Sequence, residues 1–141
     1  MTFTLRRQLT VALENQPGRL ATISRLLADS GVAVDGLCVI DNIEQGVVRI
    51  VPTDADACHD HLTSNGFYVA ESEVLAVNLT NIRGILARVT QALADGKINI
   101  DYAYVTAAQE AGYSLLVMKT SDLPRSESIL KELAFDGSHS V

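Results

Sequence analysis

The sequence predicts an α+β fold of two tandem ferredoxin-like βαββαβ units, each an antiparallel sheet with its helices on one face. The first observation is an ungapped internal repeat: adding 66 to a residue number carries Gly18 to Gly84, and identical residues recur on both sides. The second is periodicity, because runs that alternate apolar and polar residues are separated by runs with apolar residues three and four apart. The third is the order of these runs in the first copy: strand, helix, strand, strand, helix, strand.

Composition narrows the possible functions. Of the 141 residues, 48% are hydrophobic and 20% charged, which is typical of a globular protein, and no apolar run approaches the ~20 residues of a membrane-spanning helix. The net charge of −6 disfavours nucleic-acid binding. The N-terminus lacks the apolar region of a signal peptide, so we expect a cytoplasmic protein with two reduced thiols, Cys38 and Cys58.

The first copy begins with a strand and a helix. Apolar residues of odd number predict the strand; they are Phe3, Leu5, Leu9, Val11 and Leu13. Pro17-Gly18 ends it, and Leu20, Ile23 and Leu27 then mark one helix face, which Ser30-Gly31 closes.

The rest of the first copy contains three strands and a helix. Val32 to Val39 reads as a strand with a bulge near Asp35-Gly36, and the Asp41–Gly46 turn follows. Val47–Val51 is the next strand, and Asp54 opens a short helix that ends at Asn65-Gly66. Phe67–Ala70 completes the unit.

The second copy repeats this order until its last strand. The predicted elements are Val74–Leu79, a helix with Leu86, Val89 and Leu93, Ile98–Thr106, Gly112–Lys119 and a helix from Leu123 to Leu133. After Phe135 the chain is too short and polar for a strand, so the second sheet lacks one. We therefore expect units at 1–70 and 71–141, a loose tail at 136–141, and an exchange in which residues 2–5 complete the second sheet.

The turn between the first strand and helix is the main candidate site. A glycine at the start of a helix lets a ligand approach free backbone N–H groups, and the helix dipole favours a carboxylate or phosphate there. A tight turn that only caps the helix is an equally good interpretation of Asn15–Gly18 on this evidence alone.

The residues around both turns resemble the ACT domain family. The first copy carries Asn-Gln-Pro-Gly-Arg-Leu-Ala and Leu-Leu-Ala-Asp-Ser-Gly-Val-Ala-Val-Asp, and the second carries Arg-Gly-Ile-Leu-Ala and Leu-Ala-Asp-Gly-Lys-Ile-Asn-Ile-Asp-Tyr. The resemblance covers nearly the whole chain, twice. It implies side-by-side pairing of units or of whole chains, and an amino acid bound at the pair interface, between the loop before the first helix and the start of the second strand.

Residue-by-residue matching to the family gives the candidate site. Its first-copy members are Asn15, Gln16, Pro17, Gly18, Arg19, Leu20, Val34 and Asp35, and its second-copy members are Asn81, Gly84, Ile85, Leu86, Ile100 and Asp101. Backbone amides at Gly18 to Leu20 would hold the ligand carboxylate, and Asp35 its ammonium group. The second loop has Ile82 and Arg83 where the first has Gln16 and Pro17, so we expect the first loop to be the better preorganised site.

Other clusters support less specific interpretations. Tyr102, Tyr104 and Tyr113 occur only in the second copy, where they either line a pocket or pack. Asp54, Asp56, Cys58, His59, Asp60 and His61 are metal-ligand types, but the second copy has no equivalent, and a polar helix surface is the better interpretation; we predict no metal and no cofactor. No catalytic constellation is evident.

Three functional hypotheses follow. The leading one is a regulatory module without enzymatic activity that binds a free amino acid and acts on a partner protein. The second is a ligand-free scaffold or oligomerisation unit. The third, a ferredoxin-like hydrolase, is disfavoured by the missing catalytic residues.

Overall fold

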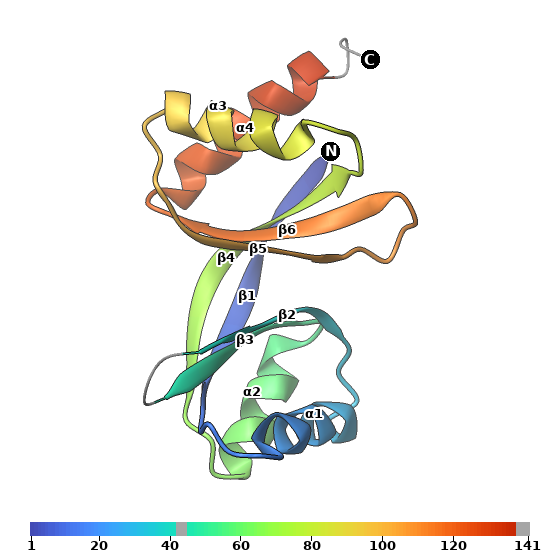
Figure 1. Ribbon diagram of the computed structural model, residues 1–141, viewed down its shortest axis with the longest axis vertical. Helices are drawn as coiled ribbons and strands as arrows, with labels where there is room; N and C mark the ends of the chain where they lie inside the picture. Colours follow the sequence, from blue (N-terminus) through green and yellow to red (C-terminus); the bar gives the residue numbers. More distant parts are fainter. Residues whose placement is uncertain (42–44, 138–141) are drawn as a thin grey trace. The chain divides into compact units, whose positions relative to one another are not determined.

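A computed structural model describes residues 1–41 and 45–137, and it has the predicted α+β fold. The elements follow one another as β1 (Thr2–Leu13), α1 (Arg19–Asp29), β2 (Val34–Ile40), β3 (Gly46–Pro52), α2 (Ala55–Ser64), β4 (Val69–Thr80), α3 (Ile85–Asp95), β5 (Ile100–Ala107), β6 (Tyr113–Thr120) and α4 (Leu123–Gly137). Figure 1 shows α1 and α2 on one face of their strands, and α3 and α4 on one face of theirs. No helix within the described residues is long and apolar enough to span a membrane.

The chain forms two compact units, and each is described by itself. The N-terminal unit is Arg7–Glu73, and the C-terminal unit combines Met1–Arg6 with the residues from Val74 onward. The strand order is β2-β3-β1-β4 in the N-terminal unit and β1-β4-β6-β5 in the C-terminal unit. Each is the ferredoxin-like order, with the first half of β1 as the fourth strand of the C-terminal unit.

Contacts along β1 explain this division. Phe3 and Leu5 pack against the core of the C-terminal unit, and the Asn78 amide donates a hydrogen bond to Thr2 Oγ1 over 3.4 Å. Further along the same strand, Leu9 and Val11 are buried in the core of the N-terminal unit. One strand therefore supplies apolar side chains to two cores.

β4 differs from the two separate strands that the sequence predicts. It runs without interruption from Val69 to Thr80, through the polar residues Glu71, Ser72 and Glu73. Arg7 on β1 forms an ion pair with Glu71 over 2.7 Å, and the Gln8 amide donates to Ser72 Oγ over 3.3 Å. These cross-strand partners keep the polar segment in the sheet, so it is not a linker.

The two cores are built from structurally equivalent positions, although the offset of 66 residues holds only to the end of β2: Leu9 pairs with Ile50, whereas its equivalent Leu75 pairs with Met118, 68 residues beyond Ile50. In the N-terminal unit the core consists of Leu9, Val11, Ile23, Leu27, Val48, Ile50, Cys58 and Leu62. In the C-terminal unit it consists of Leu75, Val77, Leu79, Val89, Leu93, Ile98, Leu116, Met118 and Leu130. Both edge strands, β2 and β5, carry a register shift near their start, and the first of these is the bulge predicted beside Asp35.

The C-terminal end departs from prediction in length. α4 continues to Gly137, four residues beyond the predicted end at Leu133. Most of the expected loose tail, 138–141, lies outside the described residues. The domain boundaries at 70 and 71 stay a prediction, to be tested by the separate stabilities of the units.

Candidate amino-acid site in the N-terminal unit

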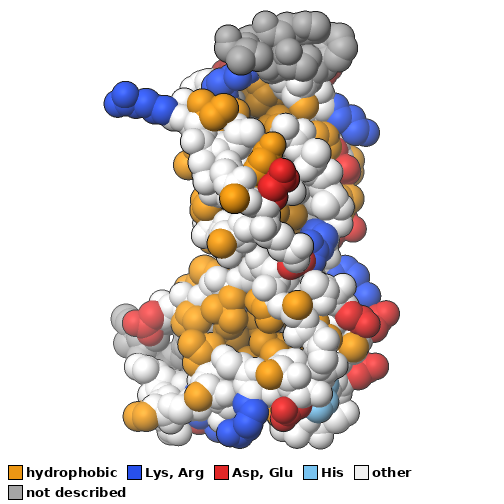
Figure 2. All heavy atoms as spheres, turned by 90° about the vertical axis from the view of Figure 1, so that its right-hand side faces the viewer, with side chains coloured by type: hydrophobic (Ala, Val, Ile, Leu, Met, Phe, Trp, Pro, Cys, Tyr) orange, Lys and Arg blue, Asp and Glu red, His pale blue; other side chains and the backbone are white. Residues whose placement is uncertain are grey.

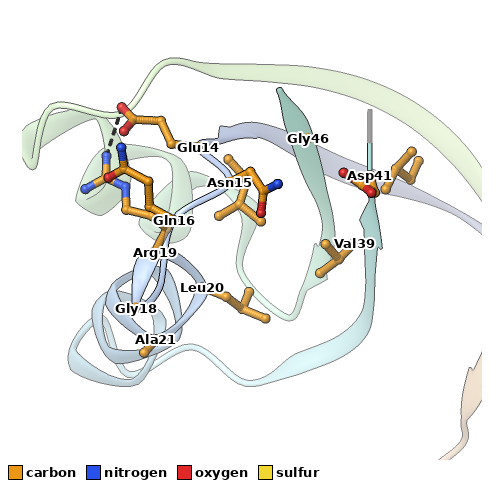
Figure 3. A pocket seen from close by; sticks show the side chains of 12 residues that line it. Glu14, Asn15, Gln16, Gly18, Arg19, Leu20, Ala21, Val39, Asp41 and Gly46 are labelled. Atoms are coloured by element: carbon orange, nitrogen blue, oxygen red, sulfur yellow. Dashed lines mark hydrogen bonds and ion pairs between the residues drawn. The ribbon is translucent and has the colours of Figure 1, made fainter. Parts of the chain in front are cut away.

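A cavity of about 290 Å³ lies in the N-terminal unit between the β1–α1 loop and the end of β2 (Figure 3). The loop side is formed by Leu13, Glu14, Asn15, Gln16, Gly18, Arg19, Leu20 and Ala21, and the strand side by Val39, Ile40, Asp41 and Gly46. Its volume is at the small end of the range for pockets that bind small molecules. The cavity therefore has the size for a metabolite rather than for a protein segment.

The N-terminus of α1 presents free donors to this cavity. Gly18 precedes the helix in the left-handed region, with φ +87°, and no side chain caps the helix. Within the described residues, the backbone N–H groups of Leu20 and Ala21 have no acceptor. By contrast, α2 in the same unit is capped by the Asp54 carboxylate, which accepts from Ala57 N–H over 3.0 Å. The uncapped donors and the helix dipole favour a carboxylate at the start of α1.

The opposite wall provides a carboxylate and apolar surface. In Figure 3 the side chains of Asn15 and Asp41 point toward one another across the cavity, and so do those of Leu20 and Val39. Leu20 and Val39 are exposed large hydrophobic residues, with 37% and 45% of their surface accessible. The Asn15 side chain has no hydrogen-bond partner in the described part of the chain. Polar and apolar groups are thus available to a ligand along separate parts of one cavity.

The charges beside the loop are mostly satisfied. Arg19 forms an ion pair with Glu14 over 3.2 Å, and Figure 3 shows this pair on the outer side of the loop, away from Leu20 and Val39. A second hollow of about 420 Å³ is lined by Glu14, Asn15, Gln16 and Gln45. The second hollow is therefore lined by polar side chains, whereas the first cavity also has apolar ones.

The structure brings together only part of the predicted first-copy site. Asn15, Gln16, Gly18, Arg19 and Leu20 line the cavity, whereas Pro17 does not. Val34 and Asp35 lie at the start of β2, outside the lining residues.

The direction of the strands explains why Val34 and Asp35 lie away from the cavity. β1 and β2 both run antiparallel to β3, so they point the same way, and the loop after β1 lies beside the end of β2. Sequence reasoning therefore missed Val39 and Asp41. The topology predicted from the sequence contains this signal, because carboxyl ends of parallel-running strands share one edge.

In the equivalent loop of the C-terminal unit, Asn81 forms hydrogen bonds within the unit. Asn81 Oδ1 accepts a hydrogen bond from Ser114 Oγ over 2.5 Å, and Asn81 N–H donates to the Gly112 carbonyl over 2.8 Å. Gly84 repeats the φ of +87° and α3 is likewise uncapped. Ala107 stands at the position equivalent to Asp41, so this unit has no carboxylate there.

The other predicted C-terminal residues are spread over two regions. Ile85 and Leu86 open α3, and Leu86 is exposed, while Ile100 and Asp101 begin β5. Asp101 accepts a hydrogen bond from the Asn99 amide over 2.9 Å. As in the N-terminal unit, the start of the edge strand lies away from the loop, for the same topological reason.

The remaining chemically notable residues contribute to packing. Tyr102, Tyr104 and Tyr113 are half-buried. Cys58 is fully buried in the N-terminal core, and burial, followed by the nearby Asp54 carboxylate, raises the pKa of its thiol to about 11. The sequence pattern placed Cys58 on a polar helix surface, and for this residue that interpretation is wrong. Within the described residues, no three His, Cys, Asp or Glu side chains gather as metal ligands.

Comparison with known families identifies the chain. A model of the ACT domain pair matches residues 2–139. The chain belongs to this family. The match spans both repeats, so the ACT domain pair accounts for the described fold from β1 to α4.

Solved structures agree with this ACT domain pair fold. A Bacteroides thetaiotaomicron protein superposes with a TM-score of 0.86 at 28% identity, covering 94% of this chain and 90% of that one. The ligand-free regulatory subunit of aspartate kinase from Thermus thermophilus gives 0.68 at 19% identity, covering 93% of both chains. Aspartokinase III from E. coli, in complex with lysine and aspartate, gives 0.59 at 16% identity, with 96% of this chain and 32% of that chain covered. None of the curated proteins compared with the chain matches it.

Proposed function

We propose that this ACT domain pair is a regulatory module that binds one free amino acid in its N-terminal unit and acts on a partner protein. The cavity between the β1–α1 loop and the end of β2 carries the proposal. There the uncapped N–H groups of Leu20 and Ala21 lie on one side and the Asp41 carboxylate on the other. Such a pair of walls matches the carboxylate and the ammonium group of an amino acid.

The amino acid acts by differential binding. Closing the cavity around a zwitterion orders the β1–α1 loop and the end of β2, so the ligand favours the conformation in which these segments meet. A partner protein that recognises this conformation would then respond to the amino-acid concentration. We propose no catalytic role, because the described lining residues offer N–H donors, amide side chains, the Glu14–Arg19 pair, the Asp41 carboxylate and apolar side chains, without a nucleophile and a base in contact.

Self-association is part of the proposal. β2 is the edge strand of the N-terminal unit, and Val34, Leu37 and Val39 are exposed along it. Figure 2 shows hydrophobic side chains gathered on a face of this unit. An edge strand with apolar side chains is a template for pairing with another chain. This surface also favours the second hypothesis, an oligomerisation module without a ligand.

A thermal-shift screen of the twenty amino acids tests the binding. A ligand at 100 times its Kd adds ~2.7 kcal/mol to the free energy of unfolding, and should raise Tm by several degrees. We expect at least one amino acid to do so, and Asp41→Ala to abolish the shift without changing the ligand-free Tm, because Asp41 is exposed. A flat panel would support the scaffold hypothesis instead.

The Asp35→Ala variant tests whether the ligand's ammonium group contacts Asp41 of the same unit or Asp35 of a second copy. Asp35 lies at the opposite end of β2 from the loop of its own unit, so we expect this variant to retain binding. Loss of binding would mean that a second copy brings the start of its β2 to the loop. That is the arrangement implied by the family resemblance, in which Val34 and Asp35 belong to the site.

A further inference from the structure

We infer that the amino acid bound by the N-terminal unit has an aliphatic side chain, of the leucine, isoleucine or valine class. This inference rests on the proposed function and concerns the specificity of the same cavity. Its basis is the separation of polar and apolar groups around the cavity, with Asn15 and Asp41 in one part and Leu20 and Val39 in another (Figure 3).

The wall next to the polar groups is apolar. Apolar residues line the cavity on both sides: Leu13, Leu20 and Ala21 on the loop side, and Val39 and Ile40 on the strand side. Leu20 and Val39 face each other and remain more than one-third exposed. A ligand side chain between them would remove apolar surface of both residues from water, and the hydrophobic effect rewards this only if that side chain is itself apolar.

The charges around the cavity argue against an acidic ligand side chain. Arg19 is the cationic side chain among the described lining residues, and it is paired with Glu14 over 3.2 Å on the outer side of the loop. An aspartate or glutamate ligand would place a second carboxylate against Leu20 and Val39 without a free cation. Desolvating an unpaired charge in this way is unfavourable.

The same reasoning disfavours a basic ligand side chain. Of the described lining residues, Glu14 and Asp41 are carboxylates, and Glu14 is already neutralised by Arg19. Asp41 then pairs with the α-ammonium group in the proposed function. A lysine ligand would carry a second ammonium group into the apolar part of the cavity, where none of the described lining residues offers a second unpaired carboxylate.

The C-terminal unit provides a natural control. Leu86 and Val105 repeat the apolar pair and are exposed, but Ala107 replaces Asp41 at the equivalent position. The Asn81 side chain is also held by Ser114. The apolar wall and the uncapped helix start are thus present there, but no carboxylate at the position of Asp41 would hold the ligand's ammonium group. A change in that wall should therefore not affect binding.

Calorimetric titration of the full chain with single amino acids tests the inference. We expect leucine, isoleucine or valine to bind at least tenfold more tightly than lysine or aspartate. Val39→Asp should weaken aliphatic binding at least tenfold, whereas Val105→Asp should leave it unchanged. Both residues are exposed on edge strands, and circular dichroism of the two variants checks that each remains folded.

The outcomes separate this inference from the proposed function. Tighter binding of lysine or aspartate than of the aliphatic amino acids would overturn the aliphatic assignment while leaving an amino-acid site. Equal effects of Val39→Asp and Val105→Asp would overturn the assignment to the N-terminal cavity. Failure of every amino acid to bind would overturn both the inference and the proposed function.

Discussion

Gly18 and Gly84 illustrate at the residue scale how much of the site depends on backbone conformation. Both have φ +87°, in the left-handed region, and an added Cβ at either position would meet no atom within 4 Å. The constraint is therefore conformational and not steric crowding by neighbours. Glycine is required at the turn because it adopts this conformation without strain.

Gly18→Ala and Gly84→Ala should have the same effect on stability and different effects on binding. Each should lower the free energy of unfolding by about 1 kcal/mol, since a left-handed alanine is strained by that order. Only Gly18→Ala should also weaken amino-acid binding, because Gly18 sets the start of α1 beside the cavity. Chemical denaturation and calorimetric titration of both variants check this. Equal loss of binding would contradict the assignment of the site to the N-terminal unit.

The candidate site residues show what could and could not be predicted from sequence. Asn15, Gly18 and Leu20 were identified because the repeat and the family resemblance both mark the loop. Asp41 was not, because it looks like any polar residue at a strand end. Asp41 becomes a candidate only when the end of β2 is placed beside the loop after β1.

At the scale of elements, β1 and β4 show most clearly which parts of the fold periodicity can and cannot predict. Periodicity, together with helix start and stop residues, predicted the position of each helix and nearly every strand, because one face of each element is buried in a core. It did not predict the continuity of β4, since the polar triplet Glu71 to Glu73 resembles a linker. The Arg7–Glu71 ion pair that holds this triplet joins residues far apart in sequence.

Substitutions along β1 should affect different units. Leu5→Ala should reduce amide-exchange protection in β6 and α4, because Leu5 packs against the core of the C-terminal unit. Val11→Ala should reduce protection in β3 and α2, because Val11 is buried in the N-terminal core. Deletion of residues 2–5 should have a stronger effect of the first kind. Unchanged protection of β6 after this deletion would rule out the strand exchange.

At the scale of the whole molecule, duplication has produced two units of the same fold with different surface chemistry. The N-terminal loop combines Asn15 and the Glu14–Arg19 ion pair with Asp41, whereas the C-terminal loop has Ile82 exposed and Ala107 at the position of Asp41. Core positions are similar because both units must fold. The loop positions are free to differ because they contribute little to either core.

We therefore expect one amino acid per chain. Titration calorimetry should give a stoichiometry of one ligand per chain, because only the N-terminal unit has the carboxylate at the end of its edge strand. The Asp41→Ala variant should then bind none. A stoichiometry of two, or residual binding of full affinity in this variant, would assign a second site to the C-terminal unit.

The division of β1 between two cores also determines the order in which the protein can fold during synthesis. Residues 1–6 leave the ribosome before both repeats are made, yet the part of β4 that belongs to the same unit begins only at Val74. The N-terminal unit has all its strands once Glu73 has emerged. At that point residues 1–6 have no partner strand, and Phe3 and Leu5 are exposed to solvent. Newly made chains therefore expose a short apolar strand until the second repeat is complete, and a ribosome stalled between the repeats would present that strand to chaperones.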